Sequence, residues 1–379
     1  MTKFALYTYS TGNIGDEIQS LAAKRFIPQV DYFINRDSVG EFRDEQNDDE
    51  IKLIANGWYM HSPYAWPPRD ENLSPLLLSM FIDVRDPEVE KTFFSDASKK
   101  YLTNYGSSIG ARDKVTEQLF QEHGIPSYWS GCVTLTLKKD ERFKQQDFIL
   151  AVDISDEVYG YLKLHTNREI IRMSPYFEVD LTKEERFLMA EYFLFLYQSA
   201  HAIVTSRLHC MLPSLAFETP VLFIETKGKY QKSRYAGLEE LVRHTTEDEY
   251  LSNYDLFDVD DPGENSSEYL RIRKKLINDI STYTGYDAAE LGNSYTSVDF
   301  TNIGYDLNFV QLVQKFMSAS FVQFQKCNTL QYQKDEIAMH YEILVQEKLK
   351  IEQENADLKQ KLSKNKTFLD KIFSRLKGS

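Results

Sequence analysis

Short apolar runs alternate with segments of helical apolar spacing over the first 245 residues of the chain. Short apolar runs predict buried strands, and apolar positions three and four residues apart predict the buried face of a helix. In the first block the pattern predicts strands over 3–9, 31–35, 51–60, 76–84, 107–113 and 126–137, and helices over 14–27, 87–106 and 113–125. In the second block it predicts strands over 147–155, 168–175, 201–206 and 220–225, and helices over 182–200, 208–217 and 234–244.

The alternation of strands and helices in each block predicts mainly parallel sheets covered by helices. We therefore predict an α/β fold of two doubly wound, Rossmann-like domains, residues 1–143 and 144–325, facing each other across a cleft. In such sheets, ligands bind at the carboxyl ends of the strands, beside the helices that follow. Residues 245–264 carry eight acidic side chains and no Lys or Arg, and we expect an exposed loop there rather than a metal site.

The segment 326–379 has a different pattern, because apolar residues recur every seven positions from Leu330 to Leu358. This spacing predicts a long helix or coiled coil, which could form a homodimer in which Asn355 sets the register. Residues 359–379 then hold seven basic side chains against one acid, Asp370, with apolar residues on one helical face. Such a helix can make a peripheral membrane contact, but an ordinary helix end that docks on the protein has the same pattern.

Composition narrows the class of protein. Apolar residues make up 42% of the chain, which indicates a folded globular protein. The formal net charge of −14 argues against a nucleic-acid partner, since general nucleic-acid binders need basic surfaces. Three distant cysteines and seven scattered histidines show no disulfide framework and no zinc-ligand spacing, so we expect no metal and no cofactor. The sequence predicts neither a secretory signal nor a transmembrane helix. We therefore expect a cytoplasmic protein, which could also lie peripherally at the inner face of the membrane.

The most informative junction is "SRLH", where a predicted strand ends and a predicted helix begins. Arg207 can bind a carboxylate or phosphate through two parallel hydrogen bonds, and the helix N-terminus adds positive potential. His209 can donate or accept a proton near neutral pH. The alternative is a buried arginine paired with a carboxylate and a histidine satisfied in the core.

A second junction is "TGNIGDE", which follows the first predicted strand. Gly12 and Gly15 flank a turn whose backbone N–H groups can hold an anion. The dinucleotide fingerprint is incomplete here, since the third glycine is missing. Asn13 and Asp16 either take part in a site or only cap the helix.

Three further stretches contain candidate residues. Arg112 lies at another strand-to-helix junction, where it could face the cleft or pair with an acid. The loop "NGWYMHSPYAWPP" gathers aromatic residues that could pack together or hold a sugar ring. The segment 227–234 holds a basic cluster that could meet a diphosphate or remain solvated.

Taken together and in order, these stretches resemble the polysaccharide pyruvyl transferases. The matching segments are "TGNIGDEIQSLAAKRFIP", "ANGWYMHSPYAWPP", "SIGARDKVTEQLFQEHGIPSYWSGCVTLTL", "SRLHCMLPSLAFETPVLFI" and "SRYAGLEEL", within residues 1–245. The resemblance implies a fold similar to the GT-B glycosyltransferases. It also implies transfer of pyruvate from phosphoenolpyruvate to two hydroxyls of a sugar, which gives a cyclic ketal.

The resemblance also implies roles for individual residues. The residues expected to bind phosphoenolpyruvate are Arg207, Leu208, Arg112 and His61. His209 is expected to donate the proton, and Asp16 is expected to act as the base. The residues expected to contact the saccharide acceptor, which could be lipid-linked, are Asn13, Glu17, Trp58, Tyr59, Lys229 and Arg234. The chain departs from the pattern at Phe81, where relatives carry a polar residue or histidine, and this puts the first-domain half of the site in doubt.

Two other functions stay open on the sequence. A nucleotide-sugar glycosyltransferase would share the architecture and the basic loops. A non-catalytic scaffold would keep the packing residues and act through the C-terminal helix. The presence of Arg112, Arg207 and His209 favours the pyruvyl transferase.

Overall fold

The fold was analysed in a computed structural model, which describes residues 2–44, 49–59, 65–83, 87–176, 181–227 and 232–302, and three single positions near the C-terminus. The chain divides into two units, Met1–Met317 and Ser318–Ser379, and the sheets belong to the first. The predicted coiled coil and its basic end, within 326–379, lie outside the described residues. Among the residues that the structure describes, no helix combines the length and the apolar character needed to cross a bilayer.

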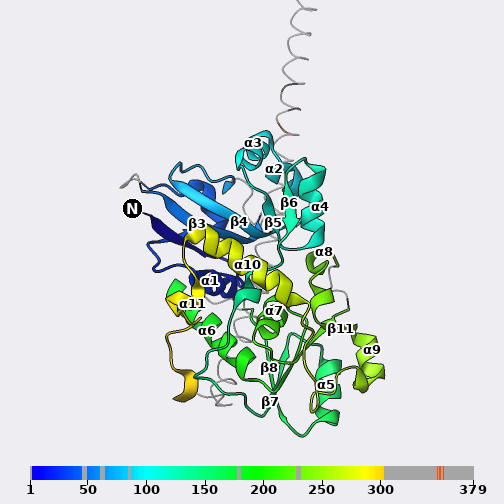
Figure 1. The fold of residues 1–379 in the computed structure, drawn as a ribbon. Helices are drawn as coiled ribbons and strands as arrows, with labels where there is room; N and C mark the ends of the chain where they lie inside the picture. Colours follow the sequence, from blue (N-terminus) through cyan, green and yellow to red (C-terminus); the bar gives the residue numbers. More distant parts are fainter. Residues whose placement is uncertain are drawn as a thin grey trace, which may run out of the picture. The chain divides into compact units, whose positions relative to one another are not determined.

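The first sheet has six parallel strands in the order β2-β1-β3-β4-β5-β6 (Figure 1). Its strands are β1 (Lys3–Thr8), β2 (Tyr32–Asn35), β3 (Ile51–Tyr59), β4 (Leu73–Ile82), β5 (Ile109–Ala111) and β6 (Ser127–Trp129). Its helices are α1 (Gly15–Lys24), α2 (Pro87–Phe93), α3 (Asp96–Asn104) and α4 (Lys114–Glu122). The central strands are apolar along most of their length because helices or loops cover both faces of a parallel sheet.

The second sheet has five parallel strands in the order β8-β7-β9-β10-β11. They are β7 (Phe148–Val152), β8 (Glu169–Met173), β9 (Ala202–Thr205), β10 (Val221–Glu225) and β11 (Arg243–Thr246). The helices of this half are α5 (Asp156–His165), α6 (Lys183–Ser199), α7 (Leu208–Ala216), α8 (Lys232–Tyr235), α9 (Glu247–Ser252), α10 (Tyr269–Thr284) and α11 (Ala288–Leu291).

Both sheets use the same doubly wound order. If the strands of each half are numbered from its own start, the order begins 2-1-3-4-5 in both. In this topology the direction of winding reverses between strands 1 and 3, and the carboxyl ends at that point form a crevice that binds ligands. The crevices are therefore expected after β1 and β3 in the first half and after β7 and β9 in the second.

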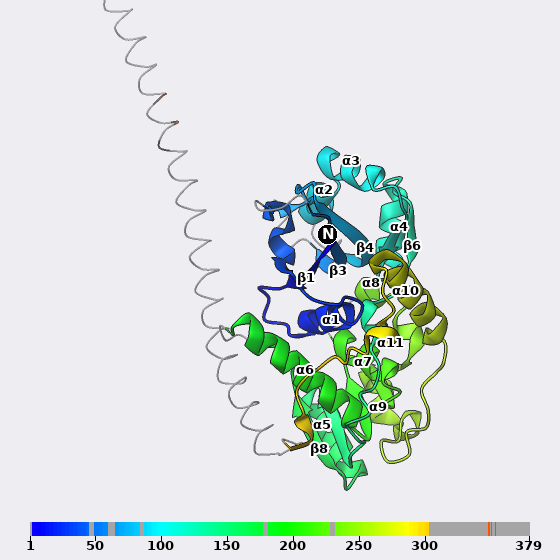
Figure 2. The same ribbon diagram turned by 60° about the vertical axis from the view of Figure 1, so that its left-hand side comes forward.

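Helix α1 joins the two halves through one hydrophobic core. All nine residues from Gly15 to Ala23 are buried, so α1 has no solvent-facing side until its last turn. It lies between the first sheet and the helices α6 and α7 (Figures 1 and 2). Its residues Ile18 and Leu21 belong to the same buried cluster as Leu6 of β1, Leu194 of α6 and Met211 of α7.

Helix α10 returns to the first sheet after the second sheet is complete. The hydroxyl of Tyr283 accepts a hydrogen bond from the backbone N–H of Leu53 at 2.7 Å. Lys52 donates to the carbonyl oxygen of Tyr283 at 2.7 Å, and the hydroxyl of Tyr128 donates to Asp279 at 2.7 Å. Residues of both blocks therefore cover the first sheet.

The structure corrects two expectations for residues 234–264. The single helix predicted over 234–244 is wrong, because α8 ends at Tyr235 and β11 begins at Arg243. Gly237 ends the helical path with a φ of +85°, in the left-handed region that favours glycine. The acidic segment 245–264 is not only a loop, since α9 starts there on a capping box formed by Thr246 and Glu249.

Candidate functional site

His209 lies in the first turn of α7, directly after β9, and only 6% of its surface is exposed. Gly15, the first residue of α1, packs against this ring. A Cβ added to Gly15 would lie only 2.9 Å from Nδ1 of His209. The other ring nitrogen, Nε2, lies 3.9 Å from the sulfur of Cys132. The imidazole is therefore held between the start of α1 and the segment that follows β6.

Burial, more than the surrounding charges, keeps the imidazole of His209 neutral. Burial lowers the pKa of His209 to about 3. Asp16 opposes this shift, while Arg112, Arg234 and Arg36 add to it by repelling a second positive charge. At pH 7 the free protein thus has an uncharged imidazole close to three guanidinium groups.

Arg112 follows β5 and is completely buried. Its guanidinium carbon lies 4.1 Å from the centre of the Phe81 ring, and its Nε lies 3.9 Å from a carboxylate oxygen of Asp113. Neither Nε nor Nη2 of Arg112 has a hydrogen-bond partner among the described residues. Burial lowers the pKa of Arg112. Unpartnered buried donors of this kind are rare in folded proteins, and a bound anion would satisfy them.

An aromatic pair connects Arg112 with a second arginine. The Trp58 ring meets Phe81 edge-on, with 5.5 Å between ring centres. On the Trp58 side, the guanidinium carbon of Arg234 lies 4.9 Å from the indole ring. Nε of Arg234 is also buried and has no partner among the described residues. The first half supplies the aromatic rings and the second half supplies Arg234.

A cavity of about 330 Å³ opens at the crevice between β7 and β9. Arg207 lines it and donates from Nε to Asp153, which follows β7 with a left-handed φ of +53°. Burial would lower the pKa of Arg207, but the charge and hydrogen bond of Asp153, together with Tyr235 and Tyr176, raise it. Arg234 lines the same cavity, and it links Arg207 to the group around His209. The complete lining consists of Asp153, Ile154, Ser155, Arg172, Ser206, Arg207, Phe223, Ile224, Thr226, Arg234 and Tyr235.

Asp16 is 3% exposed at the start of α1, and its charge acts on His209. Its carboxylate accepts hydrogen bonds from Thr11 at 2.8 Å and from Gln19 at 3.3 Å. Nη1 of the buried Arg36 lies 3.6 Å from the same carboxylate. Asp16 is therefore fixed in the crevice after β1.

The neighbours of Asp16 have different surroundings. The side chain of Asn13 accepts a hydrogen bond from the N–H of Gly15 at 3.2 Å, although the N-cap position of α1 is Ile14. Glu17 turns toward α6, where Nε of Arg186 donates to it at 2.5 Å. Burial raises the pKa of Glu17 to about 7, although Arg186 acts in the opposite direction.

The remaining predicted residues lie apart from this group or outside the described residues. Leu208 is 1% exposed and belongs to the core shared by the two halves. Tyr59 is 3% exposed in the core of the first half, with its hydroxyl 3.2 Å from that of Tyr7. His61 and Lys229 lie outside the described residues.

Sequence reasoning missed three residues of the site. Asp153 and Arg36 come directly after β7 and β2, and a search for charged residues just past each predicted strand could have found them. Cys132 carries no such signal, because its distance to His209 depends on the packing of two segments 77 residues apart.

Among the described residues, no group of three or more His, Cys, Asp or Glu side chains is arranged to hold a metal ion.

Comparison with solved structures finds distant likenesses. A functionally uncharacterised protein from Klebsiella pneumoniae is 12% identical, over 62% of this chain and 87% of its own, with a TM-score of 0.35. MnaA of S. aureus, solved with UDP, is 11% identical over 75% and 97%, with a TM-score of 0.36. The UDP-GlcNAc 2-epimerase of Methanocaldococcus jannaschii, solved with UDP-GlcNAc and UDP, is 10% identical over 76% and 94%, with a TM-score of 0.33. At these TM-scores the structural similarity does not indicate a function.

Comparison at the level of sequence families is more specific. A search of curated proteins finds no match. The model of the polysaccharide pyruvyl transferase family, however, matches residues 13–228, more than half of the chain. The matched range begins at Asn13 and includes Asp16, Arg112, Asp153, Arg207 and His209. The chain belongs to the polysaccharide pyruvyl transferase family.

Proposed function

We propose that this protein transfers the pyruvyl group of phosphoenolpyruvate to two hydroxyls of a saccharide and releases phosphate. The acceptor would be a sugar of a polysaccharide or of a lipid-linked oligosaccharide, modified in the cytoplasm. Family membership supports pyruvyl transfer in polysaccharide synthesis. The donor, the ketal product and the roles of individual residues belong to the proposal.

The observation that carries the proposal is a chain of arginines near the buried His209: the charges of Arg112 and Arg234 act on its ring, and Arg234 shares a cavity with Arg207. Arg112 and Arg234 have buried nitrogens without partners among the described residues, and Arg207 lines the adjacent cavity. Phosphoenolpyruvate carries a carboxylate and a phosphate, and guanidinium groups bind both through paired hydrogen bonds. Because the three arginines come from both halves, the anion would be held at the carboxyl ends of both sheets.

The proposed reaction balances without a redox partner. The methylene carbon of phosphoenolpyruvate takes up a proton, and the neighbouring carbon forms one bond to each of two sugar oxygens. The bond from that carbon to the phosphate oxygen breaks. One hydroxyl proton replaces the proton given to the methylene carbon, and the other leaves with the phosphate.

His209 is the proposed proton carrier, with Asp16 as its electrostatic partner and the proposed base. In the free protein, burial holds the pKa of His209 at about 3, so the ring carries no proton to donate at pH 7. A bound anion favours the charged form of a nearby base, and phosphoenolpyruvate would raise this pKa. The ring would therefore become protonated only when the donor is in place, which would limit proton transfer to the loaded enzyme.

The acceptor would lie beside Trp58, whose indole connects Phe81 with Arg234. Asn13 and Glu17 at the start of α1, Tyr59, and Lys229 and His61 outside the described residues remain predicted contacts. Glu17 and Tyr59 are the least accessible of the described residues in this group, at 1% and 3% exposed.

The direct experiment incubates the full chain with phosphoenolpyruvate and a panel of oligosaccharides, and measures phosphate release and product mass. We expect phosphate release that depends on the acceptor, together with a product heavier by one ketal-linked pyruvate. His209→Gln should lower the rate about 100- to 10,000-fold, as expected for loss of a proton-transfer group. Turnover with nucleotide sugars but not with phosphoenolpyruvate would overturn the proposal and identify a glycosyltransferase.

A further inference from the structure

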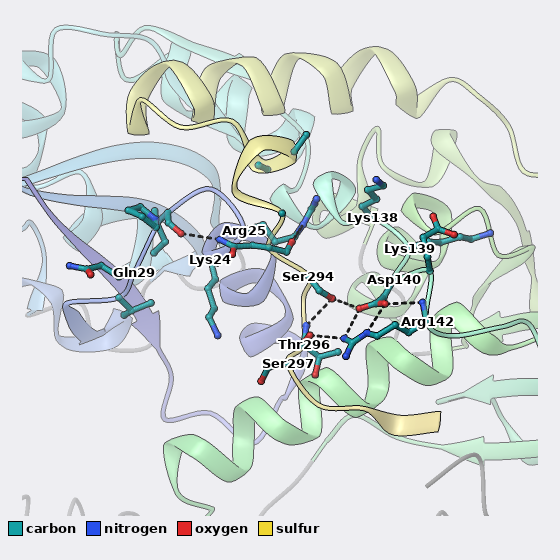
Figure 3. A pocket seen from close by; sticks show the side chains of 18 residues that line it. Lys24, Arg25, Gln29, Lys138, Lys139, Asp140, Arg142, Ser294, Thr296 and Ser297 are labelled. Carbon is teal, nitrogen blue, oxygen red and sulfur yellow. Dashed lines mark hydrogen bonds and ion pairs between the residues drawn. The ribbon is translucent and has the colours of Figure 1, made fainter. Parts of the chain in front are cut away.

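A second cavity, of about 730 Å³, lies at the other end of α1 from His209. Three segments enclose it: the end of α1, the connection from β6 to β7, and the chain around α11 (Figure 3). Gly15, which touches His209, and Lys24, which lines the cavity, are the first and last residues of α1. At a rise of 1.5 Å per residue, the two sites are about 15 Å apart along the helix. None of the proposed active-site residues that the structure describes lines this second cavity.

The lining of this cavity is basic although the protein is acidic. It contains the cations Lys24, Arg25, Lys138, Lys139 and Arg142 and the anions Asp140 and Glu141. Five positive and two negative side chains give a local charge of +3, against −14 for the whole chain. Clustered charges of one sign in a concave site concentrate ions of the opposite sign.

The anion Asp140 does not neutralise the rest of the lining. Its carboxylate accepts hydrogen bonds from Arg142 at 2.7 Å and from Ser294 at 2.5 Å. These bonds hold the pKa of Asp140 at about 2, against the effect of burial. Asp140 thus compensates Arg142, and among the described residues Glu141 is the one other acid of the lining. Outside the lining, Lys139 lies 4.0 Å from the exposed Glu218, and the charge of Lys24 acts on Glu191.

Arg25 in the lining and a partly buried arginine behind it, Arg273, increase the positive potential. Arg25 is 6% exposed and donates to the carbonyl oxygens of Thr136 and Asn293. Behind it, Arg273 donates to the carbonyl oxygens of Ala216 and Leu137 at 3.0 and 2.7 Å. Burial lowers the pKa of Arg25 to about 10, and the charge of Arg273 adds to this shift. Arg25 remains charged at pH 7, and all of these bonds go to neutral oxygens.

The other lining groups suit a saccharide more than a nucleotide. Hydroxyl and amide groups come from Gln29, Asn293, Ser294, Thr296 and Ser297, and none of the described lining residues carries an aromatic ring. Without a ring there is no platform on which a base could stack. Its volume is within the range of ordinary ligand sites. Figure 3 shows Lys24 and Lys138 on different sides of Arg25, which leaves space for separate acidic groups.

We propose that this cavity binds a carboxylate-bearing segment of the saccharide chain, separate from the site at His209. This inference rests on the proposed function, because ketal formation adds one carboxylate to every modified sugar and so makes the product chain anionic. The acidic surface of the protein would repel such a chain. The basic cavity would hold it close enough for repeated modification.

The test measures binding to the full chain by calorimetry. The probes are tetragalacturonate, a carboxylated oligosaccharide, and maltotetraose, a neutral one of equal length. We expect binding of tetragalacturonate that weakens at high salt, with no comparable binding of maltotetraose. Lys138→Glu combined with Lys139→Glu should weaken binding of tetragalacturonate at least about tenfold, because it replaces two exposed cations of the rim. The matched control is Lys100→Glu with Lys163→Glu, which makes the same change of charge on exposed residues of α3 and α5.

Each of three results would overturn the proposal. These are the absence of tetragalacturonate binding at low salt, equal weakening in both double variants, and loss of binding when phosphoenolpyruvate saturates the first site. Turnover of phosphoenolpyruvate with a short neutral acceptor is measured in parallel and should be unchanged in the Lys138/Lys139 variant. Failure of that turnover in the wild type would count against the proposed function and would leave the binding result to be judged on its own.

Discussion

The guanidinium carbon of Arg112 lies 4.1 Å from the centre of the Phe81 ring, in a position that is closed to solvent. The aromatic face is attractive to a cation and makes no hydrogen bond with it. Phe81 can therefore stabilise the buried charge while Nε and Nη2 of Arg112 have no hydrogen-bond partner in the part of the chain that the structure describes. A polar residue in place of Phe81 would instead compete for these donors, so the departure from the family pattern is compatible with anion binding.

Phe81→Leu should raise the KM for phosphoenolpyruvate about 2- to 30-fold, which corresponds to the loss of one cation–π contact. Phe81→Tyr keeps the ring and should restore a KM close to that of the wild type. Initial rates of phosphate release at varied donor concentration measure both. An unchanged KM in Phe81→Leu, or the same increase in both variants, would contradict this role for the ring.

Gly15→Ala should lower activity although alanine favours helices. A methyl group at this position would lie 2.9 Å from Nδ1 and 3.0 Å from Cβ of His209, so the imidazole must move. Displacements of this size at a catalytic group reduce rates by up to about 100-fold. Phosphate release and thermal unfolding are measured together.

The matched control for Gly15→Ala is Gly160→Ala in α5, where an added Cβ meets no atom within 4 Å. This change should stabilise the fold by up to about 1 kcal/mol and leave the rate unaltered. If Gly15→Ala behaved like Gly160→Ala in both measurements, the contact with His209 would have no functional weight.

Asp153→Asn should weaken the positioning of the Arg207 side chain, with little effect on the stability of the fold. The pair is partly solvated, with side-chain exposures of 34% and 20%, so its direct contribution to stability is modest. We expect the KM for phosphoenolpyruvate to rise several-fold, with a small change in melting temperature. Asp248→Asn, which breaks an exposed pair with Lys227, is the control and should leave KM unchanged. Equal effects of the two substitutions on KM would argue against the orienting role of Asp153.

The buried carboxyl of Glu17 should make the free energy of unfolding depend on pH. Burial raises the pKa of its carboxyl to about 7 in the folded protein, above its ordinary value of 4.5. Between these values the folded state holds a proton that the unfolded chain has released, so this group's contribution to stability falls as pH rises. Glu17→Gln removes the effect. The free energy of unfolding of the variant relative to wild type should therefore increase from about pH 5 to about pH 8 in urea titrations. A difference that stays constant over this range would mean that the ion pair with Arg186 outweighs burial, because the carboxyl would then be ionised in both states.

Most of the fold could be predicted from the sequence because the strands are nearly all apolar and the helices lie between them. The strand at 148–152 and the helix at 183–199 lie within the predicted ranges. The error at 234–244 has a local cause, since Gly237 allows a backbone turn that apolar spacing does not register. The return of α10 to the first sheet depends on contacts such as Tyr283 with Leu53, 230 residues apart, which no local pattern contains.

The site was partly predictable for a related reason. Charged residues just past a strand, such as Arg112 and Arg207, can be found by their position in the pattern. Whether they lie close together depends on how two sheets share α1. The partners of these residues, Phe81 and Asp153, come from other strands, and their distances are set by packing between segments far apart in sequence.

The burial of α1 on all sides also limits how this enzyme can move. A hinge that opened the two halves would separate Ile18 and Leu21 from either Leu6 or Met211, all of one buried cluster. Each 100 Å² of apolar surface exposed in this way would cost about 2.5 kcal/mol. Substrate access therefore falls to side chains and loops at the rim of the crevices, and rigid-body closure of two lobes is not the motion that this architecture favours.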